Sequence, residues 1–334
     1  MKPVSVLNVL AASAILLLAA CQPAGAPAAA LADAACNPAQ RAEARAARPA
    51  LEEAATEAAR LSRGPGSPAL WTLSDEDTTI YILGTVHLLR PDQEWKSPEI
   101  AAAIAEADVI VFEADTTSPA AQRELTRFSI SEGLFRDGVQ LSSLLTDAEL
   151  AELSEALEAV DLPVEALQPM RPWFAAINVS VKLMLDEGFD PEAGVEKVIE
   201  RAAREHGARF AYFETVEEQL GGLASLSDCE QVDFLMATAA GIGAGTEALD
   251  LLIDEWAEGD ITGLGLLMAN PEMIGSQAIY DVLLTERNER WVPQIIAMLD
   301  EPGTVLVAVG AGHLAGEDSV ITMLRNEGYT VEGP

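Results

Sequence analysis

Two of the three histidines in this 334-residue chain stand in the same local setting. His87 follows an apolar, β-rich run that ends in Gly84, and His313 follows a similar run that ends in Gly310. Both fit a strand followed by Gly-x-x-His. A glycine at the end of a buried strand lets the next side chains turn into the crevice beyond the strand's carboxyl end, where open α/β sheets place ligands. The two histidines are therefore the first candidates for a functional site.

Two carboxylates are expected at the same edge of the sheet. Residues 108–113 and 208–213 are apolar runs typical of buried strands; the first ends in Glu113, and Glu214 follows the second. A solvated acid at a strand end is the alternative for each. Imidazoles and carboxylates together suit a divalent ion such as Zn, Mn or Co, which acidifies a bound water or polarises a carbonyl. The histidines and carboxylates therefore predict a metal site.

The elements that must position these residues alternate between strands and helices. The expected strands are residues 70–73, 78–83, 108–113, 208–213 and 305–309. The second and third enclose a helix, which implies a right-handed crossover and parallel neighbours. Residues 118–205 and 215–299 have mainly helical patterns. We predict an α/β fold with a mixed, mainly parallel central sheet, the site at the strand C-terminal ends, and a large helical insertion.

The first 20 residues have one basic residue, Lys2, followed by a short apolar run, which is typical of a cleaved signal peptide. The run ends in Leu18-Ala19-Ala20-Cys21, which resembles the lipobox of bacterial lipoproteins, where the cysteine becomes the lipidated first residue. An ordinary secretory signal is the alternative. Gln22 after the cysteine favours the outer membrane, facing the periplasm. We expect residues 21–66 to form a tether and an N-terminal helical segment.

Charge and cysteine content narrow the class of partner. The chain has 20 Lys and Arg against 54 Asp and Glu, a net charge of −34, which argues against nucleic acid as a partner and against surface attraction to anionic lipid. Membrane attachment is therefore expected only through Cys21. Cys36 and Cys229 form an even pair, which suggests a disulfide in an oxidising compartment; two free buried thiols are the alternative.

Several segments together resemble the TraB/GumN family over residues 68–332, which makes 67–334 the expected family domain. They are Leu70-Trp71, Leu83-Gly84-Thr85-Val86-His87, Glu113, Phe213-Glu214-Thr215-x-x-Glu218-Gln219, Glu286-Arg287-Asn288-x-x-Trp291 and Val309-Gly310-Ala311-Gly312-His313-Leu314-x-Gly316. The family is similar to the Tiki metalloproteases and, more remotely, to ChaN-like haem-binding and erythromycin-esterase-like proteins. No serine-hydrolase elbow, His-Glu-x-x-His zinc motif or phosphate loop competes with this resemblance.

The resemblance to Tiki implies a metal-dependent peptidase site. The ligands would be His87, Glu113 and His313, with Arg287 and Asn288 nearby to stabilise an oxyanion. Glu214 is our choice for the general base. We therefore expect a lipid-anchored periplasmic metallohydrolase acting on a peptide or small-molecule substrate. The alternative is a non-catalytic lipoprotein of the same fold that binds a haem-like ligand; the paired carboxylates favour hydrolysis.

Overall fold

A computed structural model describes residues 38–243, 247–269 and 271–334. Within them the chain divides into two compact units. The sheet unit contains Ala47–Ala114, Glu187–Thr215 and residues 247–334, and the helical unit contains residues 38–46, Asp115–Asp186 and 216–243. The predicted signal peptide and tether, including Cys21 and Cys36, lie outside the described residues up to position 37. The predicted domain boundaries therefore stay predictions.

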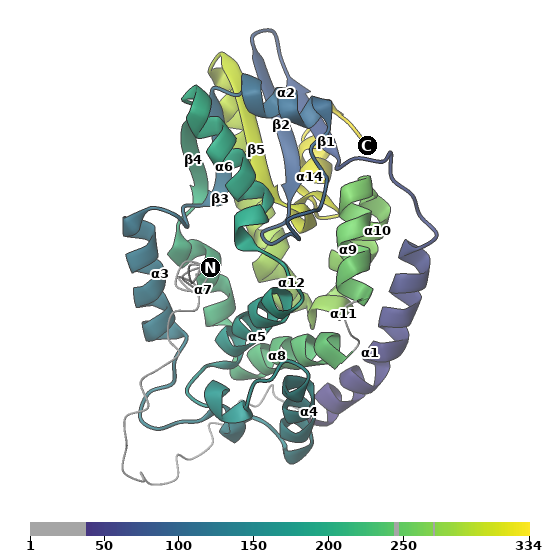
Figure 1. The fold of residues 1–334 in the computed structure, drawn as a ribbon, viewed down its shortest axis with the longest axis vertical. Helices are drawn as coiled ribbons and strands as arrows, with labels where there is room; N and C mark the ends of the chain where they lie inside the picture. The colour runs from purple at the N-terminus through teal and green to yellow at the C-terminus, as the bar shows by residue number, and fades with distance from the viewer. Residues whose placement is uncertain (1–37, 244–246, 270) are drawn as a thin grey trace. The chain divides into compact units, whose positions relative to one another are not determined.

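The sheet unit is built on six strands in the order β4-β3-β5-β2-β1-β6 (Figure 1). Their bounds are β1 (Leu70–Ser74), β2 (Thr78–Thr85), β3 (Val109–Ala114), β4 (Arg209–Glu214), β5 (Gly303–Gly310) and β6 (Val331–Glu332). Strands β4, β3, β5 and β2 are parallel, and β1 is antiparallel to both β2 and β6. The predicted α/β class with a mixed, mainly parallel sheet is confirmed.

Strand β5 lies between β2 and β3, so the expectation that these two strands are neighbours was wrong. The strands are parallel, as predicted, but the crossover through α2 (Pro98–Glu106) passes over the position that β5 later fills. The central strand is almost continuously apolar and buried, as is usual for a parallel strand covered on both faces. Its carboxyl end therefore emerges between the ends of β2 and β3.

Strand β4 is an edge strand, and the expectation that residues 208–213 form a buried strand was wrong for most of that segment. Only Phe213 and Glu214, its last two residues, are buried, and Tyr212 is 37% exposed. The reason is topological, because among the strands that the structure describes β4 pairs with β3 and ends the sheet. Its buried end is the part that reaches the carboxyl edge of the sheet.

Helices cover the sheet of this unit on both faces. Besides α2 they are α6 (Val195–His206), α9 (Glu247–Glu258), α10 (Ile261–Met268), α11 (Pro271–Ile274), α12 (Gln277–Tyr280), the π-helical segment η5 (Asp281–Thr285), α13 (Glu286–Ala297) and α14 (Val320–Asn326), with short 3-10 turns η4 (Pro191–Ala193), η6 (Met298–Asp300) and η7 (Ala311–Leu314). Helices α13 and α14 pack against one face through Trp291, Ile295 and Leu324, whereas α2 and α6 lie together in front of the sheet in Figure 1.

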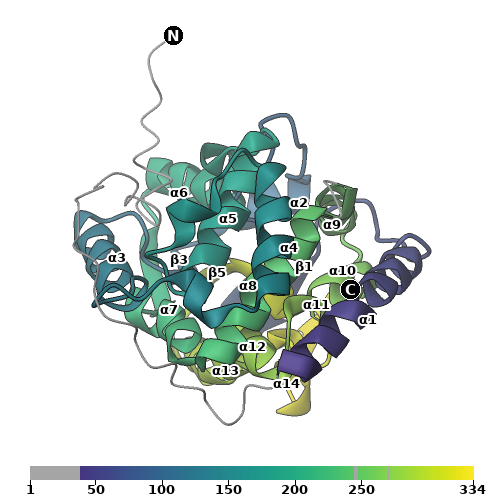
Figure 2. The same ribbon diagram turned by 90° about the horizontal axis from the view of Figure 1, so that it is seen from below.

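The helical unit contains part of the segments predicted to be mainly helical, and the rest of those segments belongs to the sheet unit. It contains α3 (Pro119–Glu132), α4 (Asp147–Glu158), α5 (Pro172–Asp186), α7 (Val216–Ser225) and α8 (Asp228–Gly243), the turns η2 (Leu141–Leu144) and η3 (Val164–Leu167), and the start of α1 (Pro38–Ala59). Helix α8 packs against α4 and α5, and the three lie side by side in Figure 2. Helix α1 is held by Arg41, whose guanidinium donates to Glu149 at 2.9 and 3.0 Å.

Candidate functional site

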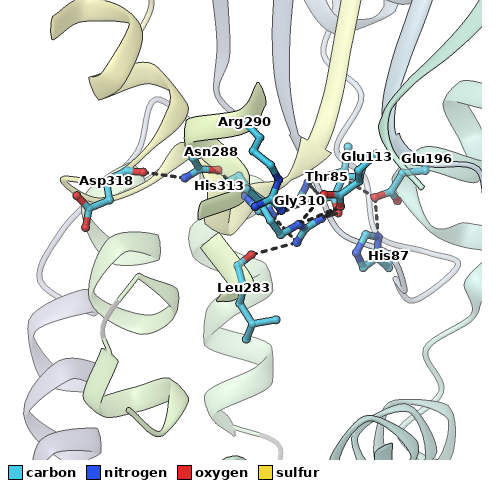
Figure 3. A network of polar contacts seen from close by, with 12 residues as sticks. Thr85, His87, Glu113, Glu196, Leu283, Asn288, Arg290, Gly310, His313 and Asp318 are labelled. Atoms are coloured by element: carbon cyan, nitrogen blue, oxygen red, sulfur yellow. Dashed lines mark hydrogen bonds and ion pairs between the residues drawn. The ribbon is translucent and has the colours of Figure 1, made fainter. Parts of the chain in front are cut away.

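The carboxyl ends of the strands bring the predicted side chains of the sheet unit into one region (Figure 3). Glu113 is the fifth residue of β3, Glu214 is the last residue of β4, and His313 lies in the turn that follows β5. His87 lies two residues beyond the end of β2. Helix α13 contributes Arg287 from its first turn. The arrangement agrees with the general position of ligand sites at the carboxyl edge of parallel sheets.

Arg287 lies at the centre of the buried part of this region. Its Nη2 donates to Glu113 Oε2 at 2.6 Å and to Glu214 Oε1 at 2.5 Å, and its Nε donates to Glu214 Oε1 at 3.0 Å. Its Nη1 donates to Leu283 O at 3.0 Å, and the guanidinium lies over the ring of Trp291. One buried cation thus faces two buried carboxylates, since all three side chains are at least 92% buried.

The two carboxylates differ in their affinity for a proton. Burial opposes ionisation of Glu113, but the charge of Arg287 and a hydrogen bond from Gly310 N at 2.6 Å outweigh it and lower its pKa. Burial dominates at Glu214 and raises its pKa, although Arg287 works against that effect. A Cβ at Gly310 would lie 3.0 Å from Glu113 Oε1, a tight contact that the Glu113 carboxylate would have to relieve by moving slightly. Glu214 is therefore the carboxylate that takes up a proton more readily.

His313 is a buried, neutral imidazole with a fixed tautomer. Asn288 Nδ2 donates to Asp318 O at 2.7 Å, so its Oδ1 faces the ring and accepts from His313 Nδ1–H at 2.6 Å. The lone pair of Nε2 then accepts from Arg287 Nη1 at 3.1 Å. Burial lowers the pKa of His313 to about 3. Asn288, predicted as an oxyanion donor, is thus engaged in orienting His313.

His87 has a different environment, which depends on a residue that the sequence did not single out. Its Nδ1 lies 2.7 Å from Glu196 Oε1, and Thr85 Oγ1 donates to the same oxygen at 2.5 Å. The imidazole is 64% exposed. The negative charge of Glu196 raises the pKa of His87 to about 9, so the ring carries a proton at neutral pH, although solvent weakens the effect at so exposed a group.

Glu196 reaches His87 because the start of α6 is fixed to the chain beyond β2. Val195 N donates to Val86 O at 3.0 Å, and a Cβ at Gly194 would lie 2.1 Å from His87 O. The glycine is therefore required for this close approach. Glu196 is separated from His87 by 109 positions and stands in a helix with several other acidic and basic side chains, so the sequence offered only a weak signal for it.

The family model of the TraB/PrgY/gumN family matches residues 69–333, which contain every residue of this region. The chain belongs to this family. The predicted resemblance is confirmed.

Individual relatives are distant. The "Uncharacterized protein YbaP" of Escherichia coli K12 is 22% identical over 245 residues, covering 73% of this chain and 87% of that protein. The "Metalloprotease TIKI1" of Danio rerio is 26% identical over 319 residues, covering 79% of this chain and 62% of that protein. No solved structure matches.

The predicted metal ligands have suitable donor atoms but not the arrangement of a metal site. Both imidazoles have their Nδ1 atoms engaged, His87 with Glu196 and His313 with Asn288, as in many metal centres with outer-shell partners. Arg287, however, fills the position between Glu113 and His313. Among the residues that the structure describes, no three His, Cys, Asp or Glu side chains are grouped to hold an ion. In this arrangement the set does not fit a divalent metal.

The remaining predictions concern residues away from this region. Cys229 is buried in α8, and its predicted partner Cys36 lies outside the described residues, as does Cys21, so the disulfide and the lipidation stay predictions. Across residues 38–243, 247–269 and 271–334, no single helix has the length and apolar character needed to span a membrane; only α8 and α9, taken as one broken pair, meet those criteria together.

Proposed function

We propose that this protein is a hydrolase, and more specifically a peptidase, acting at the carboxyl edge of the sheet. The observation that carries the proposal is the buried cluster of Arg287, Glu113, Glu214 and His313, in which ionisable groups with displaced pKa values converge. Membership of the TraB/PrgY/gumN family and the likeness to a protein named as a metalloprotease support it.

In the proposed mechanism different side chains of the protein carry out the two proton transfers. Glu214, whose pKa is raised by burial, accepts a proton from the attacking water. Protonated His87, at the exposed side, gives a proton to the leaving amine. Arg287 is the proposed partner of the oxyanion, because the amide of Asn288 is already bonded to His313 and to Asp318 O. Binding of a substrate carbonyl would require Arg287 to loosen one of its carboxylate contacts.

Metal dependence is a separate part of the proposal. A divalent ion, Mn, Co or Zn, held by His87, Glu113 and His313, would supply Lewis-acid activation. Because Arg287 occupies the space between two of these side chains, such an ion would have to displace its guanidinium. We derive no catalytic step through it.

The proposed location is the bacterial cell envelope. Lipid on Cys21 would anchor the protein to the outer membrane, facing the periplasm, where a peptide or small molecule is the expected substrate. Mass spectrometry of the mature N-terminus tests this directly: the proposal expects diacylglycerol on Cys21, and cleavage elsewhere or an unmodified Cys21 refutes it. Titration of thiols in protein denatured without reductant tests the Cys36–Cys229 disulfide, which two free thiols would exclude.

The deciding experiment compares hydrolysis and metal content in parent and variants. Protein purified without chelator is assayed for bound metal and for cleavage of a peptide library, beside His87→Ala and His313→Ala. His206→Ala is the matched control, since this third histidine is exposed at the end of α6 and its ring nitrogens lie at hydrogen-bond distance from the backbone oxygens of Ala202 and Ala107. We expect both site variants to lose cleavage and the control to keep it.

Two outcomes would contradict the proposal. Cleavage that survives in both site variants would remove the peptidase assignment. Absence of cleavage together with a Soret absorption band on the parent would instead favour the haem-like binding protein. Absence of bound metal in an active parent would overturn only the metal dependence.

A further inference from the structure

A groove on the helical unit combines positive charge with apolar surface. It encloses about 700 Å³ and lies along α3 and the residues that follow it. Its lining residues are Arg123, Thr126, Arg127, Ile130, Ser131, Leu134, Phe135 and Arg136. Three of the eight are arginines, three are apolar, and none is acidic.

Helix α3 has a buried apolar face and an outward face, and only the outward face departs from the usual amphipathic pattern. Its inner face, with Ala121, Leu125 and Phe128, is buried, and the first two pack against α7. The opposite face presents Arg123, Arg127 and Ile130 at spacings of three and four residues, and all three are exposed. Ile130 is 50% exposed, although isoleucine is usually buried. An outward face of arginines and a large aliphatic side chain is suited to contact with another surface.

The groove is positively charged, although the helical segments that form it are mainly acidic. Residues 115–186 and 216–243 contain five basic and seventeen acidic side chains. Three of the five basic ones line the groove, whereas a fourth, Arg171, lies over the ring of Phe135 at 5.6 Å and is paired with Asp228 at 3.6 Å. Within the described parts of the chain, no ion pair engages Arg123, Arg127 or Arg136. Their charges are therefore available to an anionic partner.

We propose that this groove docks the protein on a membrane surface that contains anionic phospholipid. Guanidinium groups bind phosphate through paired hydrogen bonds, and long arginine side chains place their charge at the headgroups while their stems cover apolar surface. Ile130 and Leu134 would then enter the boundary between headgroups and acyl chains. The chain's net charge of −34 repels such a surface elsewhere, so binding is confined to this face and orients the protein.

A membrane fits the groove better than an acidic protein does. Ile130 is exposed on the same face of α3 as Arg123 and Arg127, and the half-buried Leu134 and Phe135 also line the groove, which matches a layer with charge above and hydrocarbon below. The proposed lipid on Cys21 would hold the protein close to such a layer and raise the effective concentration of the groove there. The docking proposal uses that location, but vesicle binding is measured without hydrolysis, so the two proposals fail separately.

The test is sedimentation of the mature chain, residues 21–334, with lipid vesicles. Cys21→Ser removes the predicted lipid, and vesicles of phosphatidylcholine alone are compared with vesicles that also contain phosphatidylglycerol. We expect binding only to the anionic vesicles, and less of it as ionic strength rises. The double variant Arg123→Gln/Arg127→Gln should weaken partitioning by roughly fivefold for each arginine. Ile130→Ser should weaken it several-fold without changing the salt dependence.

The matched control is Arg201→Gln/Arg204→Gln, which removes the same charge from an exposed face of α6, where both arginines have acidic partners. It should bind vesicles like the parent. The proposal is overturned if the parent ignores anionic vesicles, or if the groove variants and the control bind equally. Capture of an acidic, apolar peptide by a parent that does not bind vesicles would assign the groove to a protein partner instead.

Discussion

The two Gly-x-x-His turns place the same side chain in opposite environments. His313 is buried, its Nδ1 bonded to the amide oxygen of Asn288 and its Nε2 facing Arg287. His87 is 64% exposed and bonded to the carboxylate of Glu196. The pKa of the first falls to about 3 and that of the second rises to about 9. Local sequence thus sets the place of each imidazole at a strand end, and distant neighbours set its charge.

The position of His313 also differs from one expectation. A site at the C-terminal ends of the strands is expected to lie outside the core, so that loss of either histidine would leave the fold intact. His313 instead packs against the fully buried ring of Trp291, at 4.3 Å between ring centroids. Its turn is therefore part of the core, because β5 occupies the centre of the sheet.

Removal of the cation at the buried site should have the largest effect. Arg287→Met leaves Glu113 and Glu214 buried without their counter-ion, which should lower the free energy of unfolding by about 3–5 kcal/mol. Urea denaturation measures this. Equilibrium dialysis should also show tighter binding of a divalent ion, since the two carboxylates are released.

The matched control is Arg290→Met on the same helix. Arg290 is 47% exposed and lies 3.9 Å from Glu214, so its loss should change stability by less than about 0.5 kcal/mol. Equal effects of the two substitutions would show that burial of the Arg287 cluster has no energetic importance.

Substitution of each histidine by alanine should lower the free energy of unfolding by different amounts, because one ring is buried and the other is exposed. His313→Ala removes packing against Trp291 and leaves Asn288 Oδ1 without its donor, for a loss of about 2–3 kcal/mol. His87→Ala should lose less than about 1 kcal/mol, because the ring is mostly exposed. Denaturation curves of the two variants compare them directly, and the reverse order would contradict the assigned environments.

The contributions of the two imidazoles to stability should depend on pH in opposite directions. His313 has a folded pKa below its ordinary value of 6.5, so its contribution is present above that pH and is lost as pH falls toward 3; between pH 6.5 and 5 this amounts to about 2 kcal/mol. His87 has a raised pKa, so its contribution is present below pH 6.5 and is lost as pH rises toward 9. Melting temperatures across this range, with chelator present, measure both.

Each contribution can be assigned by substitution. His313→Gln should flatten the acid side of the stability profile, and His87→Gln should flatten the alkaline side. A profile whose acid side is unchanged in His313→Gln would mean that this ring is not neutral in the folded protein.

Neutralisation of the partner of the exposed histidine should have the smallest effect on stability. Glu196→Gln can still contact Thr85 and His87, so we expect a change of less than about 1 kcal/mol. The pKa of His87 should nevertheless fall toward 6.5, because the charge of Glu196 is its largest cause of elevation. NMR titration of the imidazole measures it. Glu192→Gln, an exposed acid paired with Arg201, is the control and should leave that pKa unchanged.

The sequence determined which side chains reach the carboxyl edge of the sheet. Apolar runs that end at Gly84, Gly310, Glu113 and Glu214 predict strands, and parallel strands share an edge, so the approximate position of these groups followed from period and pattern alone. The helical character of residues 118–205 and 215–299 followed from the same periodicity. These features are local, which is why one chain without relatives suffices for them.

Only the tertiary structure decided the order of the strands and the partners of the site. The insertion of β5 between β2 and β3 depends on long-range pairing that no local pattern encodes. Glu196 approaches His87 across 109 positions, and Arg287 enters the space predicted for a metal from a helix 73 positions after Glu214. Charge and burial depend on such contacts in space. They decide which imidazole is protonated and whether a cation of the protein or a metal faces the carboxylates.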